Sequence, residues 1–204
     1  MLTASEDLNG GIMSEVLEIR WHGRGGQGAK TAALLFAGAA LDTGKYIQAF
    51  PEYGPERMGA PVTAFNRLSK DEIHIHSGIK SPDIVVVLDP SLIEPARVTQ
   101  GLKDNGILLV NTTENPQDLK KRLGLGTKVR VYTVDASRIA IETVGKDVPN
   151  APLLGALVKI TGILKFDPMM DSIKKKLTVK FRGRENLVES NLASVRRAYG
   201  EVKG

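Results

Sequence analysis

The sequence contains no cysteine among its 204 residues. Disulfides, zinc–thiolate sites, cysteine nucleophiles and cysteine-ligated iron–sulfur clusters are therefore excluded within this chain. Its three histidines, His22, His74 and His76, are too few and too scattered to indicate a metal site. No Ser–His–Asp arrangement and no cluster of carboxylates stands out either. We therefore predict no catalytic residue and no metal ligand, and interpret the chain as a binding domain rather than a self-contained enzyme.

Long apolar runs and a secretion signal are also missing. No window reaches the roughly 18 uninterrupted apolar residues of a membrane span, and residues 1–21 lack the basic-then-apolar layout of a signal peptide. We expect a cytoplasmic protein with no membrane partner. The net charge of +5 favours an anionic ligand or an acidic partner. No basic stripe with interleaved aromatic residues predicts a nucleic-acid partner.

The segments that are present alternate between strand-like and helix-like patterns. Residues 14–23 alternate apolar and polar side chains, residues 29–44 are rich in alanine and leucine, and residues 45–50 form a second strand-like run. This order predicts a strand, a buried helix and a strand. Further strands are expected at 82–90, 106–113 and 128–136, and further helices at 91–106, 115–126, 137–145, 150–164, 169–181 and 185–202.

One region departs from this rhythm. Residues 62–69 and 72–78 alternate apolar and polar side chains and predict a β-hairpin. Ile73 and Ile75 would then face the core. The two histidines of the second strand would lie on its other face, as cross-strand partners rather than ligands.

The pattern as a whole predicts an α/β fold. We expect a single doubly wound, mostly parallel sheet of Rossmann-like type, with the inserted hairpin and two C-terminal helices. No internal repeat or linker divides the chain, so residues 15–204 are expected to form one domain. Residues 1–14 are polar and aperiodic, which predicts a flexible tail, and Met13 is an alternative start site to Met1.

The first candidate site is the segment GRGGQG at residues 23–28. It follows a predicted strand and opens a predicted helix, and Gly23, Gly25 and Gly28 fit the G-x-G-x-x-G spacing of phosphate-binding loops. A helix N-terminus offers free N–H groups and a positive dipole end to an anion. The alternative is a tight turn that binds nothing. Under the first hypothesis the ligand-binding residues are Gly23, Arg24, Gly25, Gly26, Gln27 and Gly28.

The spacing alone does not identify the ligand. A dinucleotide fold places an acidic residue at the end of the second strand, where it binds the ribose hydroxyls. Here that strand ends IQAF, with Gln48 near the expected position and Glu52 slightly late. Lys30 and Thr31 follow Ala29 rather than a glycine, so the loop is not a Walker A motif either. These departures argue against NAD or FAD and leave another phosphate-bearing ligand open.

The second candidate site is the proline- and glycine-rich segment 51–69. Ordering such a loop costs conformational entropy, and loops after strand ends line the ligand crevice of a doubly wound fold. It is either a rigid surface loop, in which Glu56 and Arg57 form a structural ion pair, or one that faces a ligand or an interface. Asp89, which ends an apolar strand, is expected to cap the next helix or to face the same crevice. The candidate contact residues of the loop are Tyr53, Glu56, Arg57 and Arg67.

Together, GRGGQGAKTAALLFAGAAL (23–41) and YGPERMGAPVTAFNRLS (53–69) resemble the gamma subunits of the 2-oxoacid:ferredoxin oxidoreductases. The strands PDIVVVLDP and GILLVNT and the segment NAPLLGAL follow the same family pattern, and the resemblance covers roughly residues 15–200. The pyruvate:ferredoxin oxidoreductases, or pyruvate synthases, are the most similar branch. The pairing of the first two motifs is specific, whereas either motif alone would be weak.

The resemblance implies an activity for an assembly rather than for one chain. The family's holoenzyme converts pyruvate, coenzyme A and oxidised ferredoxin to acetyl-CoA, carbon dioxide and reduced ferredoxin. Thiamine diphosphate and magnesium belong to the alpha and beta subunits, and iron–sulfur clusters lie in the beta and delta subunits. The gamma subunit carries none of these cofactors, which agrees with the lack of cysteine.

By resemblance, this chain is expected to be a non-catalytic gamma subunit that is inactive in isolation. It would assemble with the alpha, beta and delta subunits, meet ferredoxin only through the holoenzyme and help to bind coenzyme A through residues 23–28. Coenzyme A suits the missing strand-end carboxylate, because its adenosine ribose has no free 3′-hydroxyl. Two alternatives stay open: a stand-alone NAD(P)-dependent dehydrogenase, and a scaffold subunit without a ligand. The choice of 2-oxoacid would lie in other subunits.

Overall fold

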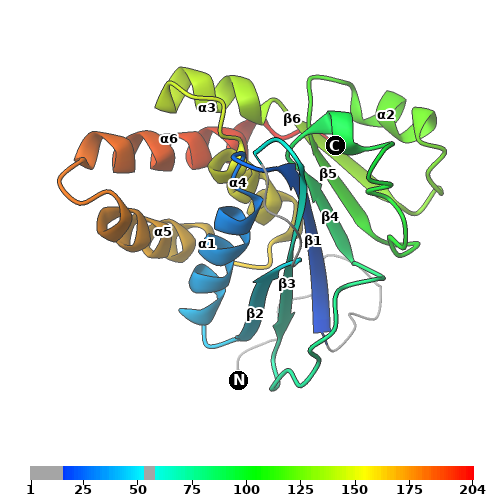
Figure 1. Cartoon of the computed structure of the whole chain (residues 1–204), viewed down its shortest axis with the longest axis horizontal. Helices are drawn as coiled ribbons and strands as arrows, with labels where there is room; N and C mark the ends of the chain where they lie inside the picture. The colour runs from blue at the N-terminus through cyan, green and yellow to red at the C-terminus, as the bar shows by residue number, and fades with distance from the viewer. Residues whose placement is uncertain (1–15, 53–57) are drawn as a thin grey trace, which may run out of the picture.

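The computed structural model describes residues 16–52 and 58–204; the tail expected at 1–14 and the loop residues Tyr53, Glu56 and Arg57 lie outside these ranges. The described residues form a six-stranded sheet with the spatial order β2-β3-β1-β4-β5-β6 (Figure 1). The strands are β1 (Val16–Arg24), β2 (Tyr46–Pro51), β3 (Pro61–Ser69), β4 (Ile84–Val87), β5 (Ile107–Asn111) and β6 (Arg130–Val134).

The sheet is mixed, with a parallel majority. β1, β4, β5 and β6 run parallel to one another, and β3 runs antiparallel to both of its neighbours, β1 and β2. β4 and β5 are buried at every position, as expected for central strands with both faces covered. The predicted α/β fold with a single, mostly parallel sheet is confirmed.

The predicted hairpin is wrong in its second strand. β3 pairs along its whole length with β1 and, on its other edge, over residues 64–69 with β2, so neither edge is left for the strand expected at 72–78. Residues 72–78 form no strand. Ile73 is half-buried and Ile75 is 43% exposed, and His74 and His76 are exposed as well. The antiparallel insertion is instead the β2–β3 pair, whose strands are consecutive in the sequence.

The helices cover the two faces of the sheet unequally. α1, α3, α4, α5 and α6 contribute to an apolar core on one face, whereas α2 and the segment 92–102 cover the other (Figure 1). No helix in the described part of the chain is both long and apolar enough to cross a lipid bilayer. The helices are α1 (Ala29–Leu41), α2 (Pro116–Arg122), α3 (Ala136–Val144), α4 (Asn150–Thr161), α5 (Phe166–Lys180) and α6 (Glu185–Glu201).

The helix expected at 91–106 does not form. A short 3-10 turn, Pro90–Leu92, is followed by hydrogen-bonded turns. Pro95 has no N–H for a helical hydrogen bond and disfavours the helical conformation of the residue before it, and Arg97 adopts a positive φ of 43°. The apolar side chains of this segment still pack against β4 and β5. The second face of the sheet is therefore covered by these turns rather than by a long helix.

Beneath this segment, two polar side chains of β1 are buried. Arg20 is 8% exposed, and its guanidinium donates to His22 Nε2 at 3.0 Å and to the backbone oxygens of Val98 and Gln100 at 2.8 and 2.6 Å. His22 accepts this hydrogen bond, so it must be neutral at that nitrogen. Burial, and secondly the charge of Arg20, lower the pKa of His22 from 6.5 to about 4.

We expect the free energy of unfolding to decrease as the pH falls from 6.5 to about 4. The folded pKa of His22 lies below the unfolded one, so in this window the unfolded chain binds a proton that the folded chain does not. The cost is absent above the unfolded pKa and grows below it to on the order of 3 kcal/mol. His22→Gln keeps an acceptor for Arg20 but cannot titrate, so it should flatten this part of the profile. Urea unfolding across the window measures both proteins, and parallel profiles would contradict the expectation.

Candidate functional site

The glycine loop joins the end of β1 to the start of α1. Gly26 and Gly28 have positive φ angles of 101° and 86°, which side chains rarely tolerate. A Cβ atom on Gly28 would lie 2.6 Å from Nδ2 of Asn150, the first residue of α4. Conformation and space therefore both require glycine at this position, and the close approach brings the N-termini of α1 and α4 together.

Asp89 ties this loop to the sheet. Its carboxylate accepts hydrogen bonds from Arg24 Nε and Gln27 Nε2, each at 3.0 Å, and caps the following 3-10 turn by accepting from the Ser91 N–H at 2.9 Å. Partial burial alone would raise the pKa of Asp89, but the hydrogen bonds from Ser91 and Gln27 and the charge of Arg24 outweigh it and lower that pKa. Asp89 thus caps the next turn, one of the two roles that the sequence left open, and its carboxylate also faces the glycine loop.

The described end of the second candidate loop lies against the glycine loop. The Gly25 N–H donates to the Ala60 oxygen at 2.9 Å, and the Gly59 N–H donates to the Gly25 oxygen at 3.2 Å. Arg24 Nη1 adds a hydrogen bond to the Gly59 oxygen at 3.0 Å. Met58, beside this pair of loops, is 91% exposed. The two motifs that the sequence singled out therefore meet at one place.

Arg67 lies away from this meeting point. It belongs to β3, is 1% exposed, and binds Glu18 Oε1 at 2.9 Å. Its guanidinium also donates to the backbone oxygens of Ile75 and Ser77 and stands 5.4 Å from the ring centroid of Phe50. These contacts anchor the irregular segment around residues 75–77 to β3. In the described structure Arg67 therefore makes buried structural contacts and is not exposed on the surface of the loop.

The glycine loop can receive an anion through its backbone. α1 has no side-chain cap at Gly28 and no acidic residue in its first turn, so the N–H groups there have no acceptor from those sources. A helix N-terminus of this kind attracts negative charge. The side chains of Arg24 and Gln27 hold the loop together, and the N–H groups of Arg24, Gly25 and Gln27 are hydrogen-bonded within the two loops. An anion would therefore meet the N–H groups at the start of α1.

Asn150 is a site residue that the sequence did not single out. It is 8% exposed, and its Oδ1 accepts from the Ala151 N–H at 2.8 Å, which orients its Nδ2 toward Gly28. A polar residue that opens an otherwise apolar helix was the only available clue. The sequence cannot show that the start of this helix faces the glycine loop, because that neighbourhood is set by the fold.

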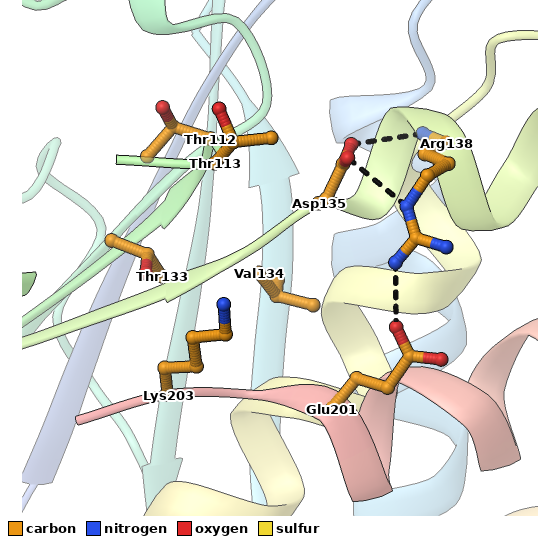
Figure 2. Close-up of a pocket in the computed structure, with 8 residues that line it drawn as sticks. All are labelled: Thr112, Thr113, Thr133, Val134, Asp135, Arg138, Glu201 and Lys203. Atoms are coloured by element: carbon orange, nitrogen blue, oxygen red, sulfur yellow. Dashed lines mark hydrogen bonds and ion pairs between the residues drawn. The ribbon is translucent and has the colours of Figure 1, made fainter. Parts of the chain in front are cut away.

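A separate cavity of about 250 Å³ opens at the ends of β5 and β6 (Figure 2). Arg138 crosses its wall, donating to Asp135 at 3.2 Å and to Glu201 at 2.8 Å, so these charges are paired and join α3 to the end of α6. Within residues 16–52 and 58–204, no group of three or more histidines and carboxylates could hold a metal ion. The lining residues are Thr112, Thr113, Thr133, Val134, Asp135, Arg138, Glu201 and Lys203.

The strand order changes the comparison with dinucleotide-binding folds. In those folds the residue that binds the ribose ends the strand next to the glycine loop. Here β3 lies between β1 and β2, so the end of β2 is not adjacent to the loop. Gln48 of β2 instead donates to the Ile73 oxygen at 3.1 Å and accepts from Arg67 at 3.3 Å. A carboxylate at that position would face these groups and not a ribose.

The chain is similar to known proteins along almost its whole length. Residues 18–201 match the family model described as pyruvate ferredoxin/flavodoxin oxidoreductase. The chain belongs to this family. The pyruvate synthase subunit PorC of Thermotoga maritima is 45% identical, over 94% of this chain and 97% of the relative. The common gamma subunit of the pyruvate/ketoisovalerate oxidoreductases of Pyrococcus abyssi is 47% identical, over 92% and 98%.

A solved structure agrees with this family assignment. The crystal structure of the pyruvate oxidoreductase subunit PorC from Thermotoga maritima matches with a TM-score of 0.79 and 43% identity, covering 93% of this chain and 98% of that one. Members of the pyruvate ferredoxin/flavodoxin oxidoreductase family that resemble this chain are thus subunits of oxidoreductases. The match confirms the family predicted from the two glycine-rich motifs and the class of protein, an oxidoreductase subunit.

Asp89→Asn should loosen both loops, because an amide presents donors to Arg24 and Gln27. We expect a loss of about 1–3 kcal/mol of stability and faster amide hydrogen exchange in residues 24–29 and 58–60. The pKa of Asp89 is lowered on folding, so its contribution is present above the ordinary value of 3.8 and is lost as the pH falls below it.

Thermal unfolding and hydrogen exchange by mass spectrometry measure these effects. Asp104→Asn is the control, since Asp104 is exposed and its side chain has no hydrogen bond or ion pair to the described residues. If amide hydrogens in the two loops exchanged equally fast in Asp89→Asn and in wild type, this carboxylate would not be what holds the loops together.

Proposed function

We propose that this chain is the non-catalytic gamma subunit of a cytoplasmic pyruvate, or related 2-oxoacid, ferredoxin oxidoreductase. It assembles with alpha, beta and delta subunits and helps to bind coenzyme A at the glycine loop. The observation that carries the coenzyme A proposal is the uncapped N-terminus of α1 behind a loop whose own side chains are already tied to Asp89. An open backbone site of this kind suits a phosphate better than a metal or a neutral ligand.

The names of the relatives support the rest of the proposal. PorC of Thermotoga maritima is a subunit of pyruvate synthase, and the Pyrococcus abyssi relative is a common subunit of pyruvate and ketoisovalerate oxidoreductases. A subunit that serves two oxoacids does not choose between them. This agrees with a division of labour in which the 2-oxoacid is selected elsewhere and this chain binds a substrate that both reactions share.

The chain's own residues are suited to binding and not to redox chemistry. The sequence has no cysteine for an iron–sulfur cluster, and the described residues hold no cluster of metal ligands for magnesium and thiamine diphosphate. The N–H groups at the start of α1 would bind the pyrophosphate of coenzyme A, and Asn150 Nδ2 would border it. The thiol end would then extend to another subunit, where the acyl group is transferred.

A stand-alone NAD(P)-dependent dehydrogenase is not favoured. β3 separates the glycine loop from the end of β2, and the carboxylate beside the loop, Asp89, is already bound by Arg24, Gln27 and Ser91. A scaffold subunit without a ligand would account for the loop held by Asp89 and for the uncapped helix alike, since α4, α5 and α6 also lack a side-chain cap. The two experiments below separate these alternatives.

Gly25→Val should raise the KM for coenzyme A of the reconstituted oxidoreductase about tenfold, the equivalent of one charge-assisted hydrogen bond. Valine leaves the backbone hydrogen bonds of Gly25 to the 59–60 segment available but adds a branched side chain where a phosphate would approach. Initial rates of pyruvate-dependent ferredoxin reduction at varied coenzyme A measure the effect.

Gly126→Val is the matched control, because its new side chain would meet open space far from the loop. The KM for pyruvate should stay constant in both variants, and a thermal unfolding curve shows that each is folded. An unchanged KM for coenzyme A in Gly25→Val would leave the scaffold role as the better account.

Nicotinamide cofactors should not bind the isolated chain. We expect no increase in its melting temperature with millimolar NAD or NADP, since a ligand that binds only the native state must raise that temperature. A concentration-dependent increase would favour the dehydrogenase over the subunit.

A further inference from the structure

The sheet has two places where neighbouring parallel strands send their connections to opposite faces. α1, after β1, and α3, after β6, lie on one face, whereas the segment 92–102, after β4, and α2, after β5, lie on the other. The connections therefore diverge between β1 and β4, where the glycine loop and Asp89 lie, and again between β5 and β6. Ligands of doubly wound sheets bind outside the carboxyl ends of the strands at such points.

The second of these places is hollow. The cavity of about 250 Å³ opens there, and we call it the β5–β6 cavity (Figure 2). Thr112 and Thr113, which follow β5, line one part of it, and Asp135, which follows β6, lines another. Lys203 reaches it from the C-terminal segment. Only Val134 contributes an apolar side chain, so a ligand of this cavity must be polar.

The acidic side chains of the β5–β6 cavity are already bound by arginines. The two oxygens of Asp135 accept from the backbone N–H and the Nε of Arg138, at 3.0 and 3.2 Å. Glu201 Oε2 accepts from Arg138 Nη2 at 2.8 Å, and its Oε1 accepts from Arg197 Nε at 2.6 Å. Each carboxylate oxygen that lines the cavity thus has a donor already. These carboxylates are therefore poor ligands for a cation.

Two other side chains of the cavity keep their donors available. Lys203 is fixed by its backbone, whose N–H donates to the Thr133 oxygen at 2.9 Å and whose oxygen accepts from the Thr133 N–H at 3.0 Å. Its side chain points toward the space between Thr133 and Val134 (Figure 2). Neither its ammonium nor the Thr113 hydroxyl has a hydrogen bond or ion pair to the part of the chain that the structure describes. The groups that remain for a ligand are thus a positive charge and a hydroxyl.

We propose that the β5–β6 cavity binds a small oxyanion, a carboxylate or phosphate group that accepts hydrogen bonds from the Lys203 ammonium and the Thr113 hydroxyl. The volume is below the range of about 300–1,000 Å³ that is typical of pockets for larger ligands, which fits a small metabolite and not coenzyme A. The site lies at a different pair of strands from the glycine loop. It therefore does not depend on the coenzyme A role.

Titration of the full-length chain with inorganic phosphate and, separately, with acetate tests the proposal. Nuclear magnetic resonance of the ¹⁵N-labelled chain follows the amides of Thr113, Asp135 and Lys203, with sodium chloride at equal ionic strength as the reference for screening. We expect saturable shifts at these amides, and the tighter of the two anions identifies the oxyanion. The amides of residues 28–31 report separately on the glycine loop.

Lys203→Met removes the ammonium but keeps an apolar stem. We expect the Kd of the bound anion to rise about tenfold, as for the loss of one charge-assisted hydrogen bond. Thr113→Val, which keeps the shape and removes the hydroxyl, should raise the Kd about threefold. Lys128→Met is the matched control, because Lys128 is exposed and does not line the cavity. A thermal unfolding curve shows that each variant is folded.

Three results would overturn the proposal. The first is a wild-type titration in which neither anion gives saturable shifts at the three cavity amides, including one whose shifts are confined to residues 28–31. The second is a Kd that Lys203→Met leaves unchanged. The third is a Kd that Lys128→Met raises as much as Lys203→Met does, since the binding would then depend on the overall charge of the chain and not on this cavity.

Discussion

One carboxylate fixes the geometry on which the candidate site depends. Asp89 stands at the end of β4 and accepts hydrogen bonds from Arg24 and Gln27 of the neighbouring loop, while it also caps the turn that follows at Ser91. Without it, the guanidinium of Arg24 would lose its counter-charge at the edge of the sheet. With it, the glycine loop and the 58–60 segment are held together by the fold itself, so the binding that we propose would cost little ordering entropy.

This tie also changes which atoms are available to a ligand. An arginine within a glycine-rich loop suggests a phosphate contact, but the charge of Arg24 is already matched by Asp89. In the proposed site, the attraction for an anion would come from the N–H groups and the dipole at the start of α1, which has no side-chain cap and no acid in its first turn. Peptide groups are fixed by the fold, so such a site is rigid, and its selectivity depends on shape more than on net charge.

The features of the fold that depend on neighbouring residues in the sequence are predicted correctly. The continuously apolar strands at 84–87 and 107–111, and the strand–loop–helix around residues 23–28, follow from composition and spacing alone. The position of β3 does not, because strand pairing joins residues far apart in the chain, and the alternating residues 72–78 carry the same local pattern as a strand. The contact between Asn150 and Gly28 is non-local as well, which is why that residue escaped notice.

The glycine loop lies at the end of β1, whereas Leu34 and Leu41 leave an apolar side of α1 exposed. A subunit that supplied only structure would need the second and not the first. A subunit that bound its substrate alone would need the first and not an exposed apolar helix. Both features are what the proposed division of labour requires: a chain that meets other subunits and offers an anion site to a substrate that those subunits share.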